Sequence, residues 1–172
     1  MKKGIAASKG YAIGNVFVYE EKELIITDEK VTDIAVELEK LQGAVALCKE
    51  QLEKIKQKTL ENVGEHEAAV FDAHLLILED PEFVGSVEAE IKNNSINALK
   101  AVETVSNSLV SLFEAIDDAY LRERAADIKD VSKRMLANLA GHTVGLEISE
   151  DNTIVVAHDL TPSDTAQLDK TK

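Results

Sequence analysis

The chain has 172 residues and a formal net charge of −13, from 32 acidic and 19 basic side chains. This length allows one generous domain, or two small ones, with a real hydrophobic core. The negative charge disfavours nucleic acid and anionic lipid as partners, because the field of the whole protein would repel both. The sequence contains no apolar membrane span and no signal-peptide pattern, and its single Cys48 cannot form an internal disulfide, so we expect a cytoplasmic protein.

The first segment, residues 3 to 19, combines glycines with small and β-branched residues. Ile13, Val16 and Val18 follow a strand pattern rather than a helical one. We therefore predict a short strand near the N-terminus.

A long helix is predicted from Thr32, because apolar residues then recur at alternating intervals of four and three. The seam consists of Ile34, Leu38, Leu41, Val45, Cys48, Leu52 and Ile55. This spacing is typical of a narrow, coiled-coil-like stripe on a helix. Cys48 lies in the stripe with no basic residue placed to activate it, so we interpret it as a small core residue rather than a reactive thiol.

Residues 59 to 91 contain nine Asp or Glu and no Lys or Arg. On a helix from about Glu65 to Asp80, the pattern separates a core face from an acidic face. The predicted core face is Val70, Phe71, His74, Ile77 and Leu78, and the predicted outer face is Glu65, Ala69, Asp72, Leu76, Glu79 and Asp80. Apolar residues surrounded by carboxylates indicate a docking patch for a basic partner, with a solvated, proline-kinked helix as the alternative.

Asp80-Pro81 should end this helix and begin a second, short one, because the residue before a proline is disfavoured in the α region. Asp80 suits the N-cap, Pro81 the first helical position and Glu82 the first turn. The short helix should run to Ile91, and the joint should leave Phe83 exposed beside the acidic face.

Two further amphipathic helices are predicted after Ser95, which can act as a cap. The first carries Val102, Val105, Leu109, Leu112 and Ile116, and the second carries Leu121, Ala125, Ile128, Met135 and Leu139. Asp117 and Asp118 interrupt the pattern between them, and Gly141 can form a C-cap. We therefore predict two helical hairpins, packed as a four-helix bundle within residues 21–142.

The C-terminal residues change character again. The stretch TIVVAHDL is a β-branched run, and TPSDTAQL predicts a turn into a helix capped by Thr161 or Ser163. The helical block is thus bracketed by two strands, which cannot hide their faces and edges alone. We expect an incomplete α/β unit made of residues 1–20 and 143–172, with the rest of its sheet beyond Lys172.

Four sequence blocks occur in a specific order: GIAASKGYAIG, AVFDAHLLILEDPEF, YLRERAADIKDVSKRML and DLTPSDTAQL. Together they resemble the enzyme I family of the bacterial phosphoenolpyruvate-dependent sugar phosphotransferase system. The resemblance implies a mainly α fold, in which a helical subdomain that binds the phosphocarrier protein HPr is inserted in a truncated α/β swivelling subdomain. It also implies that the parent protein is an enzyme and that this part of it is inactive alone.

In that family, phosphate comes from phosphoenolpyruvate with Mg²⁺ in a separate C-terminal domain, which also forms a homodimer. The acceptor histidine lies in a Gly-Gly-x-Thr-Ser-His loop that this chain lacks. We therefore expect no catalytic residue, cofactor or metal site here, and an acceptor histidine beyond Lys172. His74 is predicted in the core, and His66, His142 and His158 have no partner carboxylate in sequence.

The resemblance places the HPr-docking surface on the acidic stretch and on the second hairpin. Its residues are Glu65, Ala69, Asp72, Leu76, Ile77, Asp80, Glu82, Phe83, Phe113, Leu121 and Arg124. Arg124 matches a family position near the phosphate in transit, with an intrahelical pair to Asp127 or Glu123 as the alternative. Thr165 matches the residue that hydrogen-bonds the acceptor histidine.

Two other classes of protein remain open at this point. A plain helical interaction module would explain the seam but neither the flanking strands nor TPSDTAQL. A swivelling-domain piece of a pyruvate phosphate dikinase would explain both ends, but an inserted acidic bundle with RERAAD would not be expected there.

Overall fold

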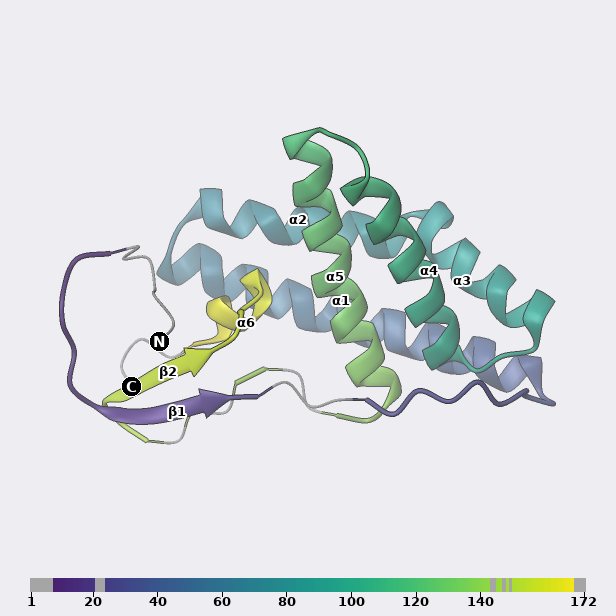
Figure 1. Ribbon diagram of the computed structural model, residues 1–172, viewed down its shortest axis with the longest axis horizontal. Coiled ribbons are helices and arrows are strands. Elements are labelled where there is room, and N and C mark those ends of the chain that lie inside the picture. The colour runs from purple at the N-terminus through teal and green to yellow at the C-terminus, as the bar shows by residue number, and fades with distance from the viewer. Residues whose placement is uncertain (1–7, 21–23, 143–144, 147, 149, 169–172) are drawn as a thin grey trace.

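The computed structural model describes residues 8–20, 24–142, 145–146, 148 and 150–168. The helices are α1 (Ile34–Asn62), α2 (Glu65–Glu79), α3 (Pro81–Asn94), α4 (Ala98–Glu114), α5 (Ala119–Leu139) and α6 (Pro162–Gln167), and the strands are β1 (Asn15–Tyr19) and β2 (Thr153–Ala157). Helices α1 to α5 form the larger body, and the two strands lie side by side at one end of it (Figure 1). The fold is mainly α, as the sequence predicts.

The strands β1 and β2 pair in parallel over their full five-residue length, with Asn15 opposite Thr153. Gly14 precedes β1 at a point where a Cβ atom would lie 2.1 Å from the carbonyl oxygen of Asn152. Only glycine fits so close an approach. The predicted N-terminal strand is confirmed for residues 15–19, while residues 3–7 of the predicted segment lie outside the described residues.

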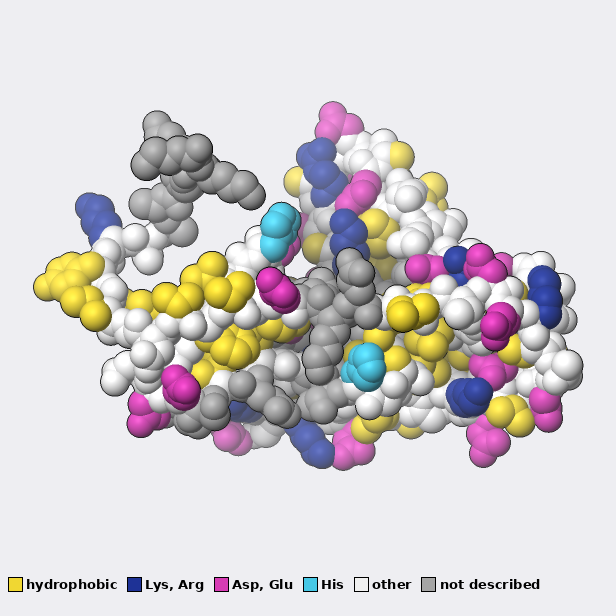
Figure 2. Space-filling model, turned by 60° about the horizontal axis from the view of Figure 1, so that its bottom comes forward, with side chains coloured by type: hydrophobic (Ala, Val, Ile, Leu, Met, Phe, Trp, Pro, Cys, Tyr) yellow, Lys and Arg dark blue, Asp and Glu magenta, His cyan; other side chains and the backbone are white. Residues whose placement is uncertain are grey.

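One face of this two-stranded sheet is open. Val16, Val18 and Val156 are exposed, and Ile13 just before β1 is 93% exposed. Hydrophobic side chains accordingly gather over the strand end of the molecule (Figure 2). Phe17 is half-buried on the opposite face. The sheet therefore leaves much of its apolar surface uncovered, which agrees with an incomplete α/β unit.

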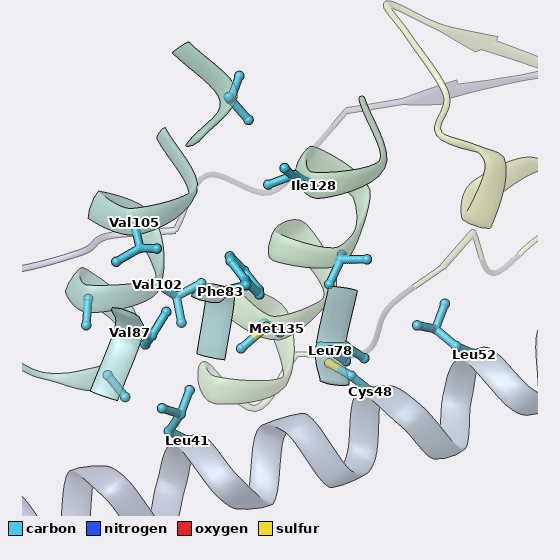
Figure 3. Close-up of a cluster of buried hydrophobic side chains, with 14 of the residues drawn as sticks. Leu41, Cys48, Leu52, Leu78, Phe83, Val87, Val102, Val105, Ile128 and Met135 are labelled. Atoms are coloured by element: carbon cyan, nitrogen blue, oxygen red, sulfur yellow. The ribbon is translucent and has the colours of Figure 1, made fainter. Parts of the chain in front are cut away.

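The predicted seam of α1 faces the core of the bundle. Leu41, Cys48, Leu52 and Ile55 are buried, and the other three seam residues pack against them at the edge. Side chains from α2, α3, α4 and α5 complete the cluster, among them Leu78, Val87, Val102 and Met135 (Figure 3). The bundle thus has one continuous core, to which the consecutive helices α2 and α3 both contribute.

The kink lies where the sequence predicts it. The Asp80 carboxylate accepts a hydrogen bond from the backbone N–H of Glu82, with 2.8 Å between Oδ1 and N. Pro81 is the first residue of α3. The exposure predicted for Phe83 is wrong, because this side chain is only 3% exposed and points into the core cluster (Figure 3). Phe83 lies one turn before Val87 and two turns before Ile91, so it shares their inward face.

Helices α4 and α5 form the second hairpin. Val102 and Val105 are buried as predicted, whereas Leu112 and Ile116 are exposed, which corrects their assignment to the core. Figure 1 shows why: the tip of this hairpin extends past α2, and no other helix covers it there. Val70 on α2 is likewise 37% exposed rather than buried.

Helix α5 ends at Leu139, and Gly141 follows it in the left-handed region with a φ of +70°, as predicted for a C-terminal cap. The Gly141 amide donates to the Asn138 carbonyl and the His142 amide to the Ala137 carbonyl, the paired bonds of a Schellman motif. Within the described residues, no helix combines the length and the apolar character that crossing a membrane requires.

Candidate functional site: an acidic and apolar docking surface

The outer face of α2 presents two apolar side chains between carboxylates. Glu65, Ala69, Asp72 and Leu76 follow one another at intervals of four, three and four, and all are exposed, Leu76 by 62%. These intervals keep the four residues on one face of a helix. The acidic outer face of α2 is therefore confirmed. Of the predicted inner face, Phe71, His74 and Leu78 are buried, while Ile77 is half-buried and Val70 is exposed.

Part of this acidic face is already neutralised by α1. Lys56 Nζ lies 2.6 Å from Asp72 Oδ1, and Lys49 Nζ lies 3.1 Å from Glu79 Oε1. The hydrogen bond to Asp72 raises the pKa of Lys56 above its ordinary value. The sequence pattern of residues 59–91 does not predict these ion pairs, because both lysines lie on α1, outside that stretch. They reach α2 only because the two helices pack together.

Other carboxylates keep their charge uncompensated. In the part of the chain that the structure describes, Glu65, Glu67 and Glu82 form no ion pair. Glu65 and Glu67 lie in the first turn of α2, where the helix dipole already favours negative charge. These carboxylates, at the start of α2 and the start of α3, are available to a basic partner.

The tip of the α4–α5 hairpin adds a second apolar area. Phe113 and Leu121 are half-buried, while Leu112, Ile116 and Tyr120 are exposed. Sequence reasoning placed Leu112 and Ile116 in the core by their spacing and overlooked Tyr120. Their spacing shows that they share a face, but only the packing shows that this part of the face lies beyond the other helices.

Arg124 lies on the first half of α5 with its guanidinium partly exposed. Nη2 and Nε donate to the Tyr120 hydroxyl oxygen at 2.8 and 3.2 Å, and Nη1 lies 3.7 Å from Asp127 Oδ2. The intrahelical pair with Asp127 that the sequence offers as an alternative is therefore present, in a loose form. Tyr120 restrains the guanidinium, while Nη1 has only this loose ion pair among the described residues.

The remaining residues predicted for docking differ in accessibility. Asp80 and Glu82 are exposed, although one oxygen of Asp80 caps α3. Ile77 is half-buried at the edge of the core. Phe83 is buried and offers no surface to a partner, so the structure does not bring it to the surface with the others.

His74 lies on the inner side of α2, opposite the acidic outer face, and is fully buried, as the sequence predicts. Its Nε2 is 3.2 Å from Asp127 Oδ1, and its Nδ1 is 3.9 Å from Asp130 Oδ2. The Phe71 ring meets the imidazole edge-on, with 5.7 Å between centroids. His74 therefore links α2 to α5 and is closed off from any partner.

Thr165 is exposed on α6, a helix capped by Thr161 with Asp164 in a capping box. Its hydroxyl donates to main-chain carbonyls of its own turn, at 3.0 Å to Pro162 and 3.2 Å to Thr161. Burial raises the pKa of the Cys48 thiol to about 11, so that thiol is not an activated nucleophile. Among the described residues, no three His, Cys, Asp or Glu side chains are grouped as a metal site requires.

These features define a class of protein: a helical bundle with an exposed acidic and apolar face, inserted between two paired strands of an α/β unit. The family model described as "PEP-utilising enzyme, N-terminal" matches residues 3–124, and the chain belongs to this family.

Curated relatives and a solved structure agree with this assignment. The chain is 46% identical to the phosphoenolpyruvate-protein phosphotransferase of Staphylococcus carnosus (strain TM300) and covers 30% of it, with 98% of the chain aligned. It is 47% identical to that of Enterococcus faecalis (strain ATCC 700802 / V583), again covering 30% of the relative and 99% of the chain. The chain therefore spans less than a third of the length of these relatives.

An NMR solution structure of an Enzyme I protein (nEIt) superposes with a TM-score of 0.83 at 41% identity, covering 99% of the chain and 70% of that structure. The N-terminal domain of Enzyme 1 - Nitrogen shares the fold, with a TM-score of 0.70 at 24% identity, covering 91% of the chain and 65% of that domain.

Proposed function

We propose that this chain is the phosphocarrier-docking part of a phosphoenolpyruvate-protein phosphotransferase, and that its partner is HPr in the cytoplasm. The observation that carries this proposal is the outer face of α2, where Leu76 is 62% exposed between carboxylates. A large exposed aliphatic side chain with a charged rim is typical of a specific protein interface. The relatives named phosphoenolpyruvate-protein phosphotransferase supply the reaction in which such docking has a purpose.

In this proposal the chain contributes to two subdomains with different roles. Residues 21–142 form the docking subdomain, and residues 1–20 with 143–172 belong to the α/β subdomain that carries the acceptor histidine. The parent protein takes phosphate from phosphoenolpyruvate with Mg²⁺, passes it through that histidine to HPr, and dimerises through a separate domain. This chain contributes affinity and orientation.

The docking surface that we propose comprises the accessible members of the predicted set. They are Glu65, Ala69, Asp72, Leu76, Ile77, Asp80, Glu82, Phe113, Leu121 and Arg124. Leu112, Ile116 and Tyr120 at the hairpin tip extend this surface. The carboxylates steer a basic partner during encounter, and the apolar side chains hold it once docked.

Arg124 has a separate role in this arrangement. Its guanidinium is held by Tyr120 but remains partly exposed, so it can turn donors toward a phosphoryl group carried by the partner. A planar fork of N–H donors suits the equatorial oxygens of a phosphoryl group in transit. Thr165 in turn faces the acceptor histidine.

Titration of the ¹⁵N-labelled chain with unlabelled HPr tests the proposal. We expect amide shifts at Ala69, Leu76 and Leu121, and weaker binding as salt rises, because screening reduces the steering by the acidic face. Shifts confined to residues 34–55 of α1, or no shifts at all, would reject the docking assignment.

A further inference from the structure

The short helix α6 is held in place from outside. It has six residues, and a helix of this length is not stable by itself in water. It packs on α1, where the Lys58 ammonium donates to the Gln167 carbonyl oxygen at 3.2 Å. Two polar contacts to its first turn come from the second half of α5, the same helix that carries Arg124 in its first half. How α6 is attached therefore decides where Thr165 lies relative to the docking surface.

Asp130 makes the first of these contacts. Its carboxylate is only 3% exposed, and Oδ2 accepts the backbone N–H of Ser163 at 3.0 Å, across 33 residues of sequence. Ser163 is the second residue of α6, so Asp130 satisfies one of the amides that a helix leaves free in its first turn. A carboxylate at this position also suits the positive end of the helix dipole.

Lys133 makes the second contact, one turn further along α5. Its Nζ lies 3.0 Å from Oδ2 of Asp164, and Asp164 is 2% exposed. The same oxygen accepts from the backbone and the hydroxyl of Thr161. Asp130 and Lys133, on adjacent turns of α5, therefore both contact the first turn of α6. Two such contacts restrain the direction of α6 as well as its position.

Asp130 also faces the bundle. His74 Nδ1 lies 3.9 Å from its Oδ2, too far for a hydrogen bond, and the charge of Asp130 acts on the buried guanidinium of Arg134. Arg134 is 2% exposed, and burial lowers its pKa while the nearby Asp130 opposes that change. The Asp130 carboxylate thus has neighbours from α2, α5 and α6.

We propose that Asp130 is a positioning residue, which fixes α6 and its Thr165 on the helix that carries Arg124. Asp130 lies six positions after Arg124, a rise of about 9 Å along an α-helix. Because α5 is a single helix of 21 residues, Arg124 and the residue that holds the first turn of α6 lie on the same element. The role of this geometry in transfer rests on the proposed function, in which Thr165 faces the acceptor histidine.

Distance measurement between two spin labels tests the proposal on this chain. Labels at Arg122→Cys on α5 and Thr165→Cys on α6 report the attachment of α6, since both positions are exposed, and the buried Cys48 stays unlabelled. We expect one narrow distance distribution without further change, and a broad one in Asp130→Ala. Asp130→Asn should restore the narrow distribution, because its amide oxygen can still accept the Ser163 N–H.

Lys129→Ala is the matched control. Lys129 is next to Asp130 on α5, but its Nζ pairs with the exposed Glu114 and not with α6. We expect the narrow distribution to persist in this variant. An unchanged distribution in Asp130→Ala would overturn the proposal, as would an Asp130→Asn variant that behaves like the alanine.

A second measurement tests the proposal even if Asp130→Ala does not fold. In the unsubstituted chain, a scalar coupling across the hydrogen bond should join the Ser163 ¹⁵N to the Asp130 carboxylate ¹³C, and its absence would overturn the proposal. In Asp130→Asn, the Ser163 amide should exchange at a rate within about tenfold of the unsubstituted chain.

Titration of the same variants with HPr separates this inference from the proposed function. Asp130 is buried and is not a residue of the proposed docking surface, so HPr should bind Asp130→Ala with unchanged affinity. Loss of HPr binding in every form of the chain would reject the proposed function. A broadened distance distribution in Asp130→Ala would still support the role of Asp130 in holding α6.

Discussion

The Nε2 atom of His74 lies 3.2 Å from Oδ1 of Asp127, and this contact joins α2 and α5, which both contribute to the proposed docking surface. His74 is on the inner face of α2, two residues before the exposed Leu76. Asp127 is on α5, one turn after Arg124, whose guanidinium it also meets. Through Asp127, the backbone of α2 beneath Leu76 is joined to the part of α5 that carries Arg124, so the two helices are held together before a partner arrives. Such preorganisation lowers the ordering cost of binding.

Leu76→Ala should weaken HPr binding by more than about 1 kcal/mol, mainly through faster dissociation, because a buried aliphatic anchor holds a complex that charges have steered together. Leu76 is 62% exposed in the free chain, so the melting temperature should change little. Surface plasmon resonance and thermal denaturation measure the two effects. Leu47→Ala on α1, 42% exposed, is the control, and equal effects on binding in both variants would contradict the prediction.

Phe83→Ala should act on stability rather than on binding alone. The side chain is 3% exposed within the core cluster, and truncating a buried phenylalanine costs roughly 3–5 kcal/mol. Urea denaturation followed by circular dichroism measures this loss. A change below 1 kcal/mol combined with a large loss of HPr affinity would return Phe83 to the docking surface.

Cys48 should make stability depend on pH in the alkaline range. Burial raises its pKa from the ordinary value of 9.0 to about 11, so the folded chain keeps the thiol proton to higher pH than the unfolded chain. The contribution is complete below the unfolded pKa and is lost as pH rises toward 11, by up to roughly 2–3 kcal/mol. Cys48→Ala lacks this term.

Urea denaturation of both proteins at pH 8, 9.5 and 11 tests the prediction. The difference in free energy of unfolding between the unsubstituted chain and Cys48→Ala should shrink as pH rises. Lysine and tyrosine titrate in the same range, but they are common to both proteins. A difference that stays constant with pH would show that the thiol is not shielded as the structure indicates.

Hydrogen exchange should separate the sheet from the bundle. The amides of β1 should exchange much faster than those around Val105 of α4, because β1 pairs only with β2 and leaves Val16 and Val18 exposed. Mass spectrometry of peptic fragments, or NMR, resolves the two regions. Equal protection of both would show that the sheet is closed in solution, for example by pairing between two chains along its open edge.

The chain should dock phosphorylated HPr without accepting its phosphate. His74 is fully buried, and the exposed His66, His142 and His158 have no ion pair with a carboxylate among the described residues. Phosphoryl transfer needs an acceptor held in line with the phosphorus. Mass spectrometry of histidine peptides after mixing is the measurement, and phosphate on any of these four histidines at the rate of an intact enzyme would make the docking face an active site.

The local patterns of the sequence determined much of this protein. Backbone sterics and hydrogen bonding act within a few residues, so local patterns specify local structure. Examples are the intervals of three and four along α1, the Asp80-Pro81 break and the capping residues of α6. The outer face of α2 was predictable for the same reason, since Ala69 and Leu76 alternate with carboxylates at helical spacing. The resemblance in four blocks located the docking residues and Thr165, whose roles stay predictions.

Tertiary structure decided which of those faces are covered. Phe83 and Leu112 both lie on apolar helix faces, yet Phe83 is buried in the core cluster while Leu112 lies exposed on the hairpin tip. The pairing of Asp72 with Lys56, and the bond from Ser163 to Asp130, join residues 16 and 33 positions apart. Such contacts depend on how helices cross, which follows from the packing of the whole core rather than from any single stretch of sequence.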